Sequence, residues 1–241
     1  MSSTRQLTIV QLYSRDMNIY GDHGNVLVLK RRAEWHGYSV KVIEYNPGDS
    51  FPESVDIIIG GGGQDSGQDK IQADLLKIGP KLHELAEKGT PILVICGLYQ
   101  LFGKYFKTQD GHIIEGINLL DIRTTAGPER LIGNIVVESD QFGEIIGYEN
   151  HSGQTFLGAK VKPLGNVIRG AGNNGGDDWE GARYKNIIGS YLHGSLLPKN
   201  PHIADWLIEQ AAINKFGNFE PQVIDDRFAN LAREHAAKRP R

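Results

Sequence analysis

Residues 91–103, PILVICGLYQLFG, place an apolar run directly before the only cysteine of the chain and a helical pattern directly after it. An apolar run that ends in a turn predicts a buried strand, and here the strand leads straight into a helix. The residue at such a turn lies above the sheet edge, facing the free N–H groups of the helix. Because the positive end of a helix favours a thiolate, Cys96 is predicted to be a nucleophile in an α/β fold. A lone cysteine can also be a small buried hydrophobe.

Apolar runs and helical patterns alternate on either side of this stretch, which predicts a parallel sheet with crossover helices. The second half has short apolar runs between glycine-rich turns, which predicts an antiparallel extension of the sheet. The predicted strands are Leu7–Tyr13, Ser39–Tyr45, Val55–Ile59, Gly133–Glu138, Glu144–Tyr148 and Ile187–Leu192. The predicted helices are Gly24–Trp35, Asp69–Lys88 and one that follows Pro201.

No linker or internal repeat divides the 241 residues, so we predict a single domain over 1–241, with a core of about 6–217 and a tail of about 218–241. The first residues do not resemble a signal peptide, and no apolar run is long enough to span a membrane. We therefore expect a cytoplasmic protein without membrane insertion. The formal charge of −3 gives no electrostatic case for binding nucleic acid. The basic end from Arg233 to Arg241 is expected to be solvated.

A cysteine nucleophile needs a base, and His193 is the best candidate. It follows the apolar strand Ile187–Leu192, so it should lie at the same carboxyl edge of the sheet as Cys96. His151 is the second candidate, although its polar surroundings also suit a structural hydrogen-bonding turn.

Four consecutive glycines, Gly60 to Gly63, follow the strand Val55–Ile59. Glycines let backbone approach a substrate closely and aim N–H groups at an oxyanion, although the run could also be a plain flexible turn. The sequence lacks a phosphate-binding G-x-x-x-x-G-K-[ST] motif, so another polypeptide should bind any ATP that the chemistry needs. We expect neither a metal site nor a cofactor in this chain.

Several segments together resemble class I glutamine amidotransferases, in particular the cobyric acid synthase-like branch and, within it, the glutaminase subunits of lipid II isoglutaminyl synthases. The resembling segments are 96–103, the glycines 60–63, 147–151 (GYENH), 17–25 (MNIYGDHGN), 130–134 (RLIGN) and 191–200 (YLHGSLLPKN). The resemblance covers nearly the whole chain. It implies the class I glutamine amidotransferase fold, a mostly parallel central sheet flanked by helices with an antiparallel extension.

The resemblance also implies roles for individual residues. Cys96 would attack the side-chain amide of glutamine, and His193 would relay the proton to the leaving ammonia. Arg130 matches the position at which the family grips the glutamine substrate. The backbone of Gly97, with Gly62 or Gly63, would form the oxyanion hole.

The partner implied by the resemblance is a MurT-like, Mur ligase-like subunit that forms a heterodimer with the chain. That subunit would bind ATP and magnesium, receive the ammonia and amidate the stem-peptide glutamate of lipid II to isoglutamine. The alternatives are an amidotransferase subunit for another carboxylate, such as a corrin, and a non-catalytic regulatory subunit with the same fold.

Two features depart from the family pattern. Val94 and Leu98 stand where the family usually has glycine around the cysteine, and Ser195 stands where it commonly has the glutamate that orients the histidine. No nearby residue obviously replaces that glutamate. We therefore predict that an Asp or Glu is delivered in trans by the partner subunit.

Overall fold

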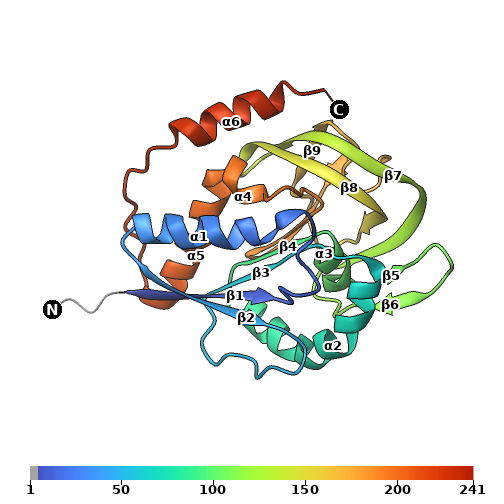
Figure 1. The fold of residues 1–241 in the computed structure, drawn as a ribbon, viewed down its shortest axis with the longest axis horizontal. Coiled ribbons are helices and arrows are strands. Elements are labelled where there is room, and N and C mark those ends of the chain that lie inside the picture. Colours follow the sequence, from blue (N-terminus) through green and yellow to red (C-terminus); the bar gives the residue numbers. More distant parts are fainter. Residues whose placement is uncertain (1–4, 241) are drawn as a thin grey trace.

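The protein is described by a computed structural model that covers residues 5–240, so the outermost residues of the predicted domain, 1–4 and 241, lie outside the described part. A first sheet of six strands runs through the middle of the molecule in the order β11-β12-β4-β3-β1-β2 (Figure 1). All neighbouring strands are parallel except β11, which is antiparallel to β12. The strands are β1 (Gln6–Leu12), β2 (Ser39–Tyr45), β3 (Ile57–Gly60), β4 (Ile92–Ile95), β11 (Ala182–Tyr184) and β12 (Ile187–Ser190).

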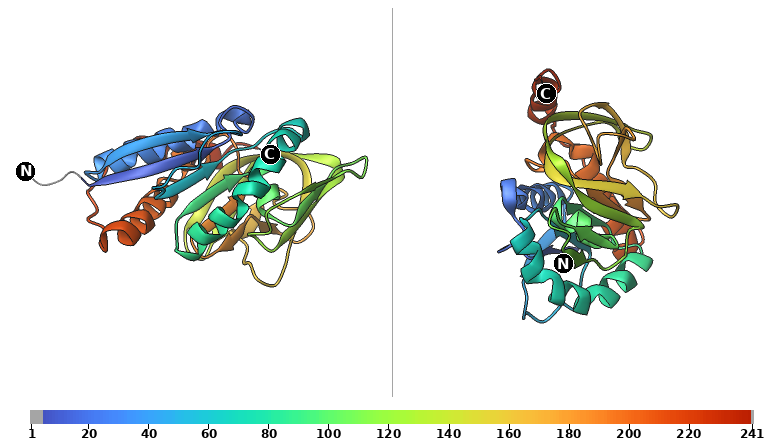
Figure 2. Two further views of the ribbon diagram at one scale, coloured as in Figure 1. Left: turned by 90° about the horizontal axis from the view of Figure 1, so that it is seen from below. Right: turned by 90° about the vertical axis from the view of Figure 1, so that its right-hand side faces the viewer.

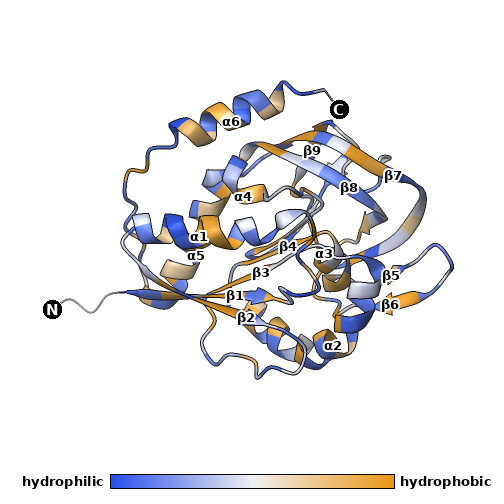
Figure 3. Ribbon diagram, in the orientation of Figure 1, coloured by the Kyte–Doolittle hydropathy of each residue, from blue (hydrophilic) through white to orange (hydrophobic). Residues whose placement is uncertain are grey.

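Helices cover both faces of this sheet. Helices α1 (His23–Trp35) and α5 (Pro201–Phe216) lie on one face, and α2 (Asp65–Glu87) lies on the other (Figures 1 and 2). Strands β3 and β4 are buried along their whole length, which explains why they read as unbroken apolar runs, and the central strands appear as the hydrophobic interior in Figure 3. Except for β11, which the sequence analysis did not predict, the strands and helices named so far lie within a few residues of their predicted bounds.

The antiparallel part takes a form that the sequence pattern did not specify. Strand β11 extends the first sheet, whereas the other strands form a second sheet in the order β10-β9-β7-β5-β6, with β8 paired to β7. Its neighbouring strands are antiparallel except β5 and β7, which are parallel. Its bounds are β5 (Tyr105–Lys107), β6 (Ile113–Glu115), β7 (Ile122–Ser139), β8 (Gly143–Leu157), β9 (Gly165–Arg169) and β10 (Trp179–Glu180). The predicted strands 133–138 and 144–148 are the turn-proximal halves of the long hairpin of β7 and β8.

The C-terminal segment was expected to be a solvated end, and its described residues are exposed or half-exposed, but part of it forms a helix that the sequence analysis did not predict. Residues Arg227–Ala237 form helix α6, which lies across α4 (Leu196–Lys199) and the β7–β8 hairpin (Figure 1). Helix α6 buries none of its residues. Polar contacts hold it instead, because Arg233 donates to the carbonyls of Lys199 and Glu144 at 3.0 and 2.8 Å.

Among residues 5–240, no helix combines the length and apolar character that a membrane span requires.

Candidate active site

Cys96 lies in the turn between β4 and α3 (Gly97–Phe102), with φ +49° and ψ −104°. This left-handed conformation is strained for a residue with a side chain and is typical of a nucleophile held on a sharp strand-to-helix turn. The turn is tight although Val94 and Leu98 replace the usual glycines. The facing strand accounts for this: a Cβ on Gly60 would lie 3.3 Å from Cγ1 of Val94 and 3.4 Å from Cβ of Leu98. The space left by the missing side chain of Gly60 accommodates both.

His193 and Cys96 lie against the same glycine. A Cβ on Gly62 would be 2.8 Å from Cε1 of His193 and 3.1 Å from Cβ of Cys96, so a larger residue at 62 would press on both. The His193 side chain is fully buried, and its backbone N–H donates to Tyr148 in β8 at 2.7 Å. The structure thus brings together the two residues that the sequence assigned to the nucleophile and the base.

The electrostatic surroundings of His193 favour its protonated form. Burial alone would lower the pKa of His193, but negative charge on Cys96 and on Asp22 outweighs burial and raises that pKa to about 10. An imidazolium beside a cysteine favours the thiolate.

Asp22 is a residue of the site to which the sequence analysis assigned no role. Its carboxylate is 1% exposed, and Oδ2 lies 3.7 Å from Nδ1 of His193, which is within ion-pair distance but longer than a hydrogen bond. A carboxylate of this chain thus lies near His193, although the sequence analysis found no nearby residue that obviously replaces the missing glutamate. Two signals pointed to Asp22: its place in the segment 17–25, which was quoted for the family resemblance, and its position two residues before the helix predicted from Gly24.

Asp22 also corrects the assignment of the oxyanion hole. The backbone N–H of Gly62 donates to Oδ2 of Asp22 at 2.7 Å and is therefore engaged. Gly63 and Gly97 fit the assignment better, because a Cβ on Gly97 would lie 3.0 Å from the backbone nitrogen of Gly63. The backbones of Gly63 and Gly97 thus lie close together, with Gly97 directly following Cys96.

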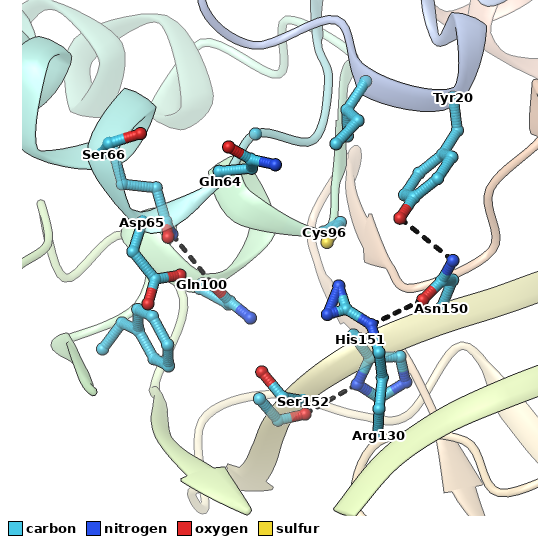
Figure 4. Close-up of a pocket in the computed structure, with 15 residues that line it drawn as sticks. Tyr20, Gln64, Asp65, Ser66, Cys96, Gln100, Arg130, Asn150, His151 and Ser152 are labelled. Atoms are coloured by element: carbon cyan, nitrogen blue, oxygen red, sulfur yellow. Dashed lines mark hydrogen bonds between the residues drawn. The ribbon is translucent and has the colours of Figure 1, made fainter. Parts of the chain in front are cut away.

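A cavity of about 340 Å³ opens over Cys96, and Arg130 lines it. The Arg130 side chain extends toward Cys96 (Figure 4). Its Nε donates to Oδ1 of Asn150 at 2.8 Å, and Nδ2 of Asn150 donates to the Tyr20 hydroxyl at 3.0 Å. The Tyr20 ring in turn contacts His193 edge-on, with ring centroids 5.0 Å apart. Asn150 and Tyr20 were not singled out in the sequence; both lie within segments quoted for the family resemblance.

His151, the second candidate base, lies at the cavity wall in a structural setting. Burial lowers the pKa of His151 to about 3, so its ring is neutral near pH 7. The ring stacks on Tyr191 with centroids 3.6 Å apart, and Nδ1 donates to the carbonyl of Gly153 at 2.6 Å. These contacts fix the ring, and they fit the alternative that His151 belongs to a structural hydrogen-bonding turn.

Within the described residues, no group of three or more His, Cys, Asp or Glu side chains is arranged to hold a metal ion.

A family model described as the CobB/CobQ-like glutamine amidotransferase domain matches residues 8–201. The chain belongs to this family. Two curated relatives bear the name lipid II isoglutaminyl synthase (glutamine-hydrolyzing) subunit GatD. This amidotransferase is 45% identical to the one from Staphylococcus aureus N315, over 92% of this chain and 90% of the relative. It is 40% identical to the one from Streptococcus pneumoniae R6, over 88% of this chain and 83% of the relative. A probable cobyric acid synthase from Methanococcus maripaludis C6 is 31% identical over 70% of this chain and 36% of the relative.

Solved structures show the same fold at lower identity. A crystal structure of a glutamine amidotransferase matches this amidotransferase with a TM-score of 0.60 and 16% identity, covering 84% of this chain and 98% of that one. A second glutamine amidotransferase structure, from Thermotoga maritima, matches with a TM-score of 0.54 and 15% identity, covering 95% of this chain and 93% of that one. The expected fold class is thereby confirmed.

Proposed function

We propose that this amidotransferase is the glutaminase subunit of a lipid II isoglutaminyl synthase, in which Cys96 and His193 release ammonia from glutamine. The observation that carries the proposal is the placement of Cys96 and His193 against Gly62, with Cys96 lining the cavity that also holds Arg130. The similarity along nearly the full length of two relatives named as glutamine-hydrolysing subunits supports the substrate.

The proposed first step forms a thioester. The Cys96 thiolate attacks the side-chain carbonyl carbon of glutamine, and the N–H groups of Gly63 and Gly97 stabilise the oxyanion that develops. The C–N bond then breaks while the His193 imidazolium gives its proton to the leaving nitrogen, which departs as ammonia. In the second step neutral His193 takes a proton from water, the resulting hydroxide attacks the thioester, and the C–S bond breaks to release glutamate and the Cys96 thiolate.

Arg130 is proposed to bind the α-carboxylate of glutamine. Only its Nε is engaged by Asn150, so the two terminal nitrogens of the guanidinium can form parallel hydrogen bonds with a carboxylate. The link from Asn150 to Tyr20 and on to His193 would place the bound carboxylate in a fixed position relative to the base.

The ammonia is proposed to pass to a MurT-like, Mur ligase-like partner that forms a heterodimer with this chain. With ATP and magnesium, that partner would activate the α-carboxylate of the D-glutamate in the lipid II stem peptide and convert it to D-isoglutamine. No cofactor is proposed for the amidotransferase itself, and the cytoplasm is the proposed site of the reaction.

The test is glutamate release from glutamine by the complex with the ligase, together with mass spectrometry of the lipid II product. Replacing Cys96 with Ala or Ser should abolish glutamate release, because neither residue supplies a thiolate. Replacing His193 with Ala should lower turnover about 10²- to 10⁴-fold, the usual contribution of general acid–base catalysis. His151→Ala is the comparison, and we expect it to reduce thermal stability more than turnover.

Three results would contradict the proposal. Retention of activity in the Cys96→Ala variant would exclude the nucleophile. A larger loss of turnover in His151→Ala than in His193→Ala would reverse the choice of base. Absence of glutamate release from the parent complex would favour a regulatory subunit with the same fold.

A further inference from the structure

Helix α2 carries a buried glutamine, Gln68, that lies against the first turn of α3. The residue is 1% exposed, and its Nε2 donates to the carbonyl oxygen of Gly97 at 3.0 Å and to Oε1 of Gln100 at 2.8 Å. A backbone carbonyl only accepts hydrogen bonds, so the nitrogen of the Gln68 amide must be the atom that faces Gly97. The contacts therefore fix which way this amide is turned.

The hydrogen bonds continue from Gln68 into the core. Because Oε1 of Gln100 accepts from Gln68, its Nε2 is left to donate, and it does so to the Tyr191 hydroxyl at 3.1 Å. That hydroxyl lies 2.7 Å from Oγ1 of Thr155, within hydrogen-bond distance. A buried polar network whose members are paired holds its side chains rigidly. Gln68 is thus held in one orientation, with both hydrogens of its amide in use.

The oxygen of the same amide, Oε1 of Gln68, is the polar atom that remains. It accepts no hydrogen bond from residues 5–240, and it is not sealed from solvent. Gln68 lines the cavity over Cys96, so this oxygen offers a fixed acceptor to a molecule in the cavity. A nearly buried acceptor discriminates between ligands, because a ligand without a matching donor leaves it unpaired.

Glutamine brings three polar groups into this cavity. The proposed mechanism assigns the carboxamide to Cys96 and the carboxylate to Arg130, which leaves the α-ammonium without a partner. Two acceptors of the cavity wall are already engaged, because Oδ1 of Asn150 accepts from Arg130 and the Tyr20 hydroxyl accepts from Asn150. The α-ammonium therefore needs an acceptor elsewhere on the wall.

Asp65 is a second acceptor on the cavity wall. It is exposed and lies in the first turn of α2, where the partial positive charge of the helix N-terminus offsets its negative charge. Solvent also screens an exposed carboxylate. Gln68 has neither disadvantage, and because its side chain is already fixed, it loses little conformational entropy when a ligand binds.

We propose that Gln68 is a specificity-determining residue whose Oε1 accepts a hydrogen bond from the α-ammonium of glutamine. This inference rests on the proposed glutaminase function. Arg130 and Gln68 then recognise the amino-acid end of the substrate, while Cys96 acts on the carboxamide end. The site should therefore discriminate against amides that lack the α-ammonium.

The test compares glutamine with glutaramate (5-amino-5-oxopentanoate), which has the same chain, carboxamide and carboxylate and lacks only the α-ammonium. Ammonia release by the complex with the ligase gives kcat/KM for each amide. The parent should prefer glutamine about 10- to 100-fold, the value expected for a hydrogen bond to a charged group. Gln68→Met keeps the length of the side chain and removes its polar atoms, so it should abolish most of this preference.

The ratio of the two kcat/KM values separates recognition from a structural role. Loss of the hydrogen bonds to Gly97 and Gln100 disturbs the nucleophile turn, but this lowers kcat/KM for both amides and cancels in the ratio. Gln72→Met is the matched control, since Gln72 lies one turn further along α2 and donates to the carbonyl of Glu115 at 3.4 Å. It should leave both kcat/KM values unchanged.

A second variant, Gln68→Glu, decides the question if Gln68→Met does not fold. A carboxylate still accepts from an ammonium but cannot donate to Gly97. The preference for glutamine should therefore persist in Gln68→Glu, while kcat/KM falls for both amides. Loss of the preference in this variant contradicts the proposal.

Other outcomes also overturn the proposal. One is a parent that does not distinguish the two amides, and another is an undiminished preference in Gln68→Met. A third is loss of the preference in Asp65→Asn but not in Gln68→Met, which assigns the α-ammonium to Asp65.

Calorimetric binding of both amides to Cys96→Ala, with and without Gln68→Met, separates this inference from the proposed function. If the parent complex releases no ammonia from glutamine, the proposed function fails, while calorimetry still decides the role of Gln68. Tighter binding of glutamine than of glutaramate that depends on Gln68 supports the proposal. Equal affinity for the two amides, or no binding of either, overturns it.

Discussion

Cys96 and His193 could be found from the sequence because each stands where an apolar strand ends. Parallel strands bring their carboxyl ends to one edge, so two residues far apart in the chain were predicted to meet there. Asp22 could not be found in this way, because it precedes helix α1 and does not follow a strand. Gly62 was assigned to the oxyanion hole because a run of glycines does not reveal which N–H groups are already engaged.

Arg130 gives a prediction at the same scale. Arg130→Ala should raise KM for glutamine and lower kcat/KM about 10- to 100-fold, the value expected for hydrogen bonds to a charged group. Arg130→Lys should recover little, because an ammonium cannot form two parallel hydrogen bonds. The measurement is steady-state glutaminase kinetics with glutamine as the varied substrate.

Arg123→Ala serves as the control for Arg130, since Arg123 is an exposed arginine of the same strand, β7, where it lies over the Phe156 ring. It should leave kcat/KM unchanged. Equal kinetics for Arg130→Ala and the parent would remove Arg130 from the substrate site.

At the scale of elements, the buried parallel strands were predictable because unbroken apolar runs bounded by turns have few other interpretations. The second sheet was not predictable, because the period-2 patterns in β7 and β8 identify strands but do not indicate which sheet the strands join. Helix α6 was missed for another reason. It buries no residue, so its amphipathic pattern appeared as a basic tail rather than as an element packed on the core.

The entry to helix α1 gives a prediction in which two effects oppose each other. Helix propensity alone would make Gly24→Ala stabilising by up to about 1 kcal/mol. The collision of the added Cβ with the Ser195 hydroxyl oxygen should instead make it destabilising by about 1–3 kcal/mol, the usual cost of overpacking. Denaturant unfolding of the variant gives the sign directly.

Ser195→Gly in the same chain should offset much of the Gly24→Ala loss, because it removes the colliding hydroxyl and suits the backbone of Ser195, whose φ is +50°. A Gly24→Ala variant more stable than the parent would show that Gly24 and Ser195 do not lie in close contact.

At the scale of the whole molecule, the two sheets meet at Glu180. Its carboxylate in β10 accepts from the Ser190 hydroxyl at 2.7 Å and from the N–H of Tyr191 at 2.8 Å, which ties the second sheet to β12 of the first. Burial raises the pKa of Glu180 to about 7, although these hydrogen bonds act in the opposite direction.

The raised pKa of Glu180 predicts a pH-dependent stability. The folded protein keeps this proton up to about pH 7, whereas a glutamate in the unfolded chain loses it near about 4.3. Because the folded state binds more protons in that window, the contribution of Glu180 to stability falls as pH rises through it. Between about pH 4.5 and pH 8, the free energy of unfolding of Glu180→Gln should therefore rise relative to that of the parent by on the order of 2–3 kcal/mol.

Thermal unfolding of parent and variant across this pH range measures the difference, in which the other ionising groups cancel. Glu138→Gln, at an exposed glutamate of β7, is the matched control for the loss of a carboxylate. A stability difference for Glu180→Gln that does not vary with pH would mean that Glu180 has the same pKa in the folded and unfolded chain.

Contacts between the two ends of the core also bear on when the site can form during synthesis. The Ser195 hydroxyl donates to the carbonyl of Gly21, and the N–H of Leu197 donates to Oδ1 of Asn25. These hydrogen bonds join residues separated by 174 and 172 positions, so the ribosome must deliver nearly the whole core before Asp22 can meet His193. Contacts of such long sequence separation form late, after the loop-closure entropy has been overcome. A nascent or truncated chain that already displays the Cys96 turn would therefore lack the charge pair that favours its thiolate. The reactive form of this cysteine, and with it glutamine hydrolysis, is therefore expected only once the core has folded.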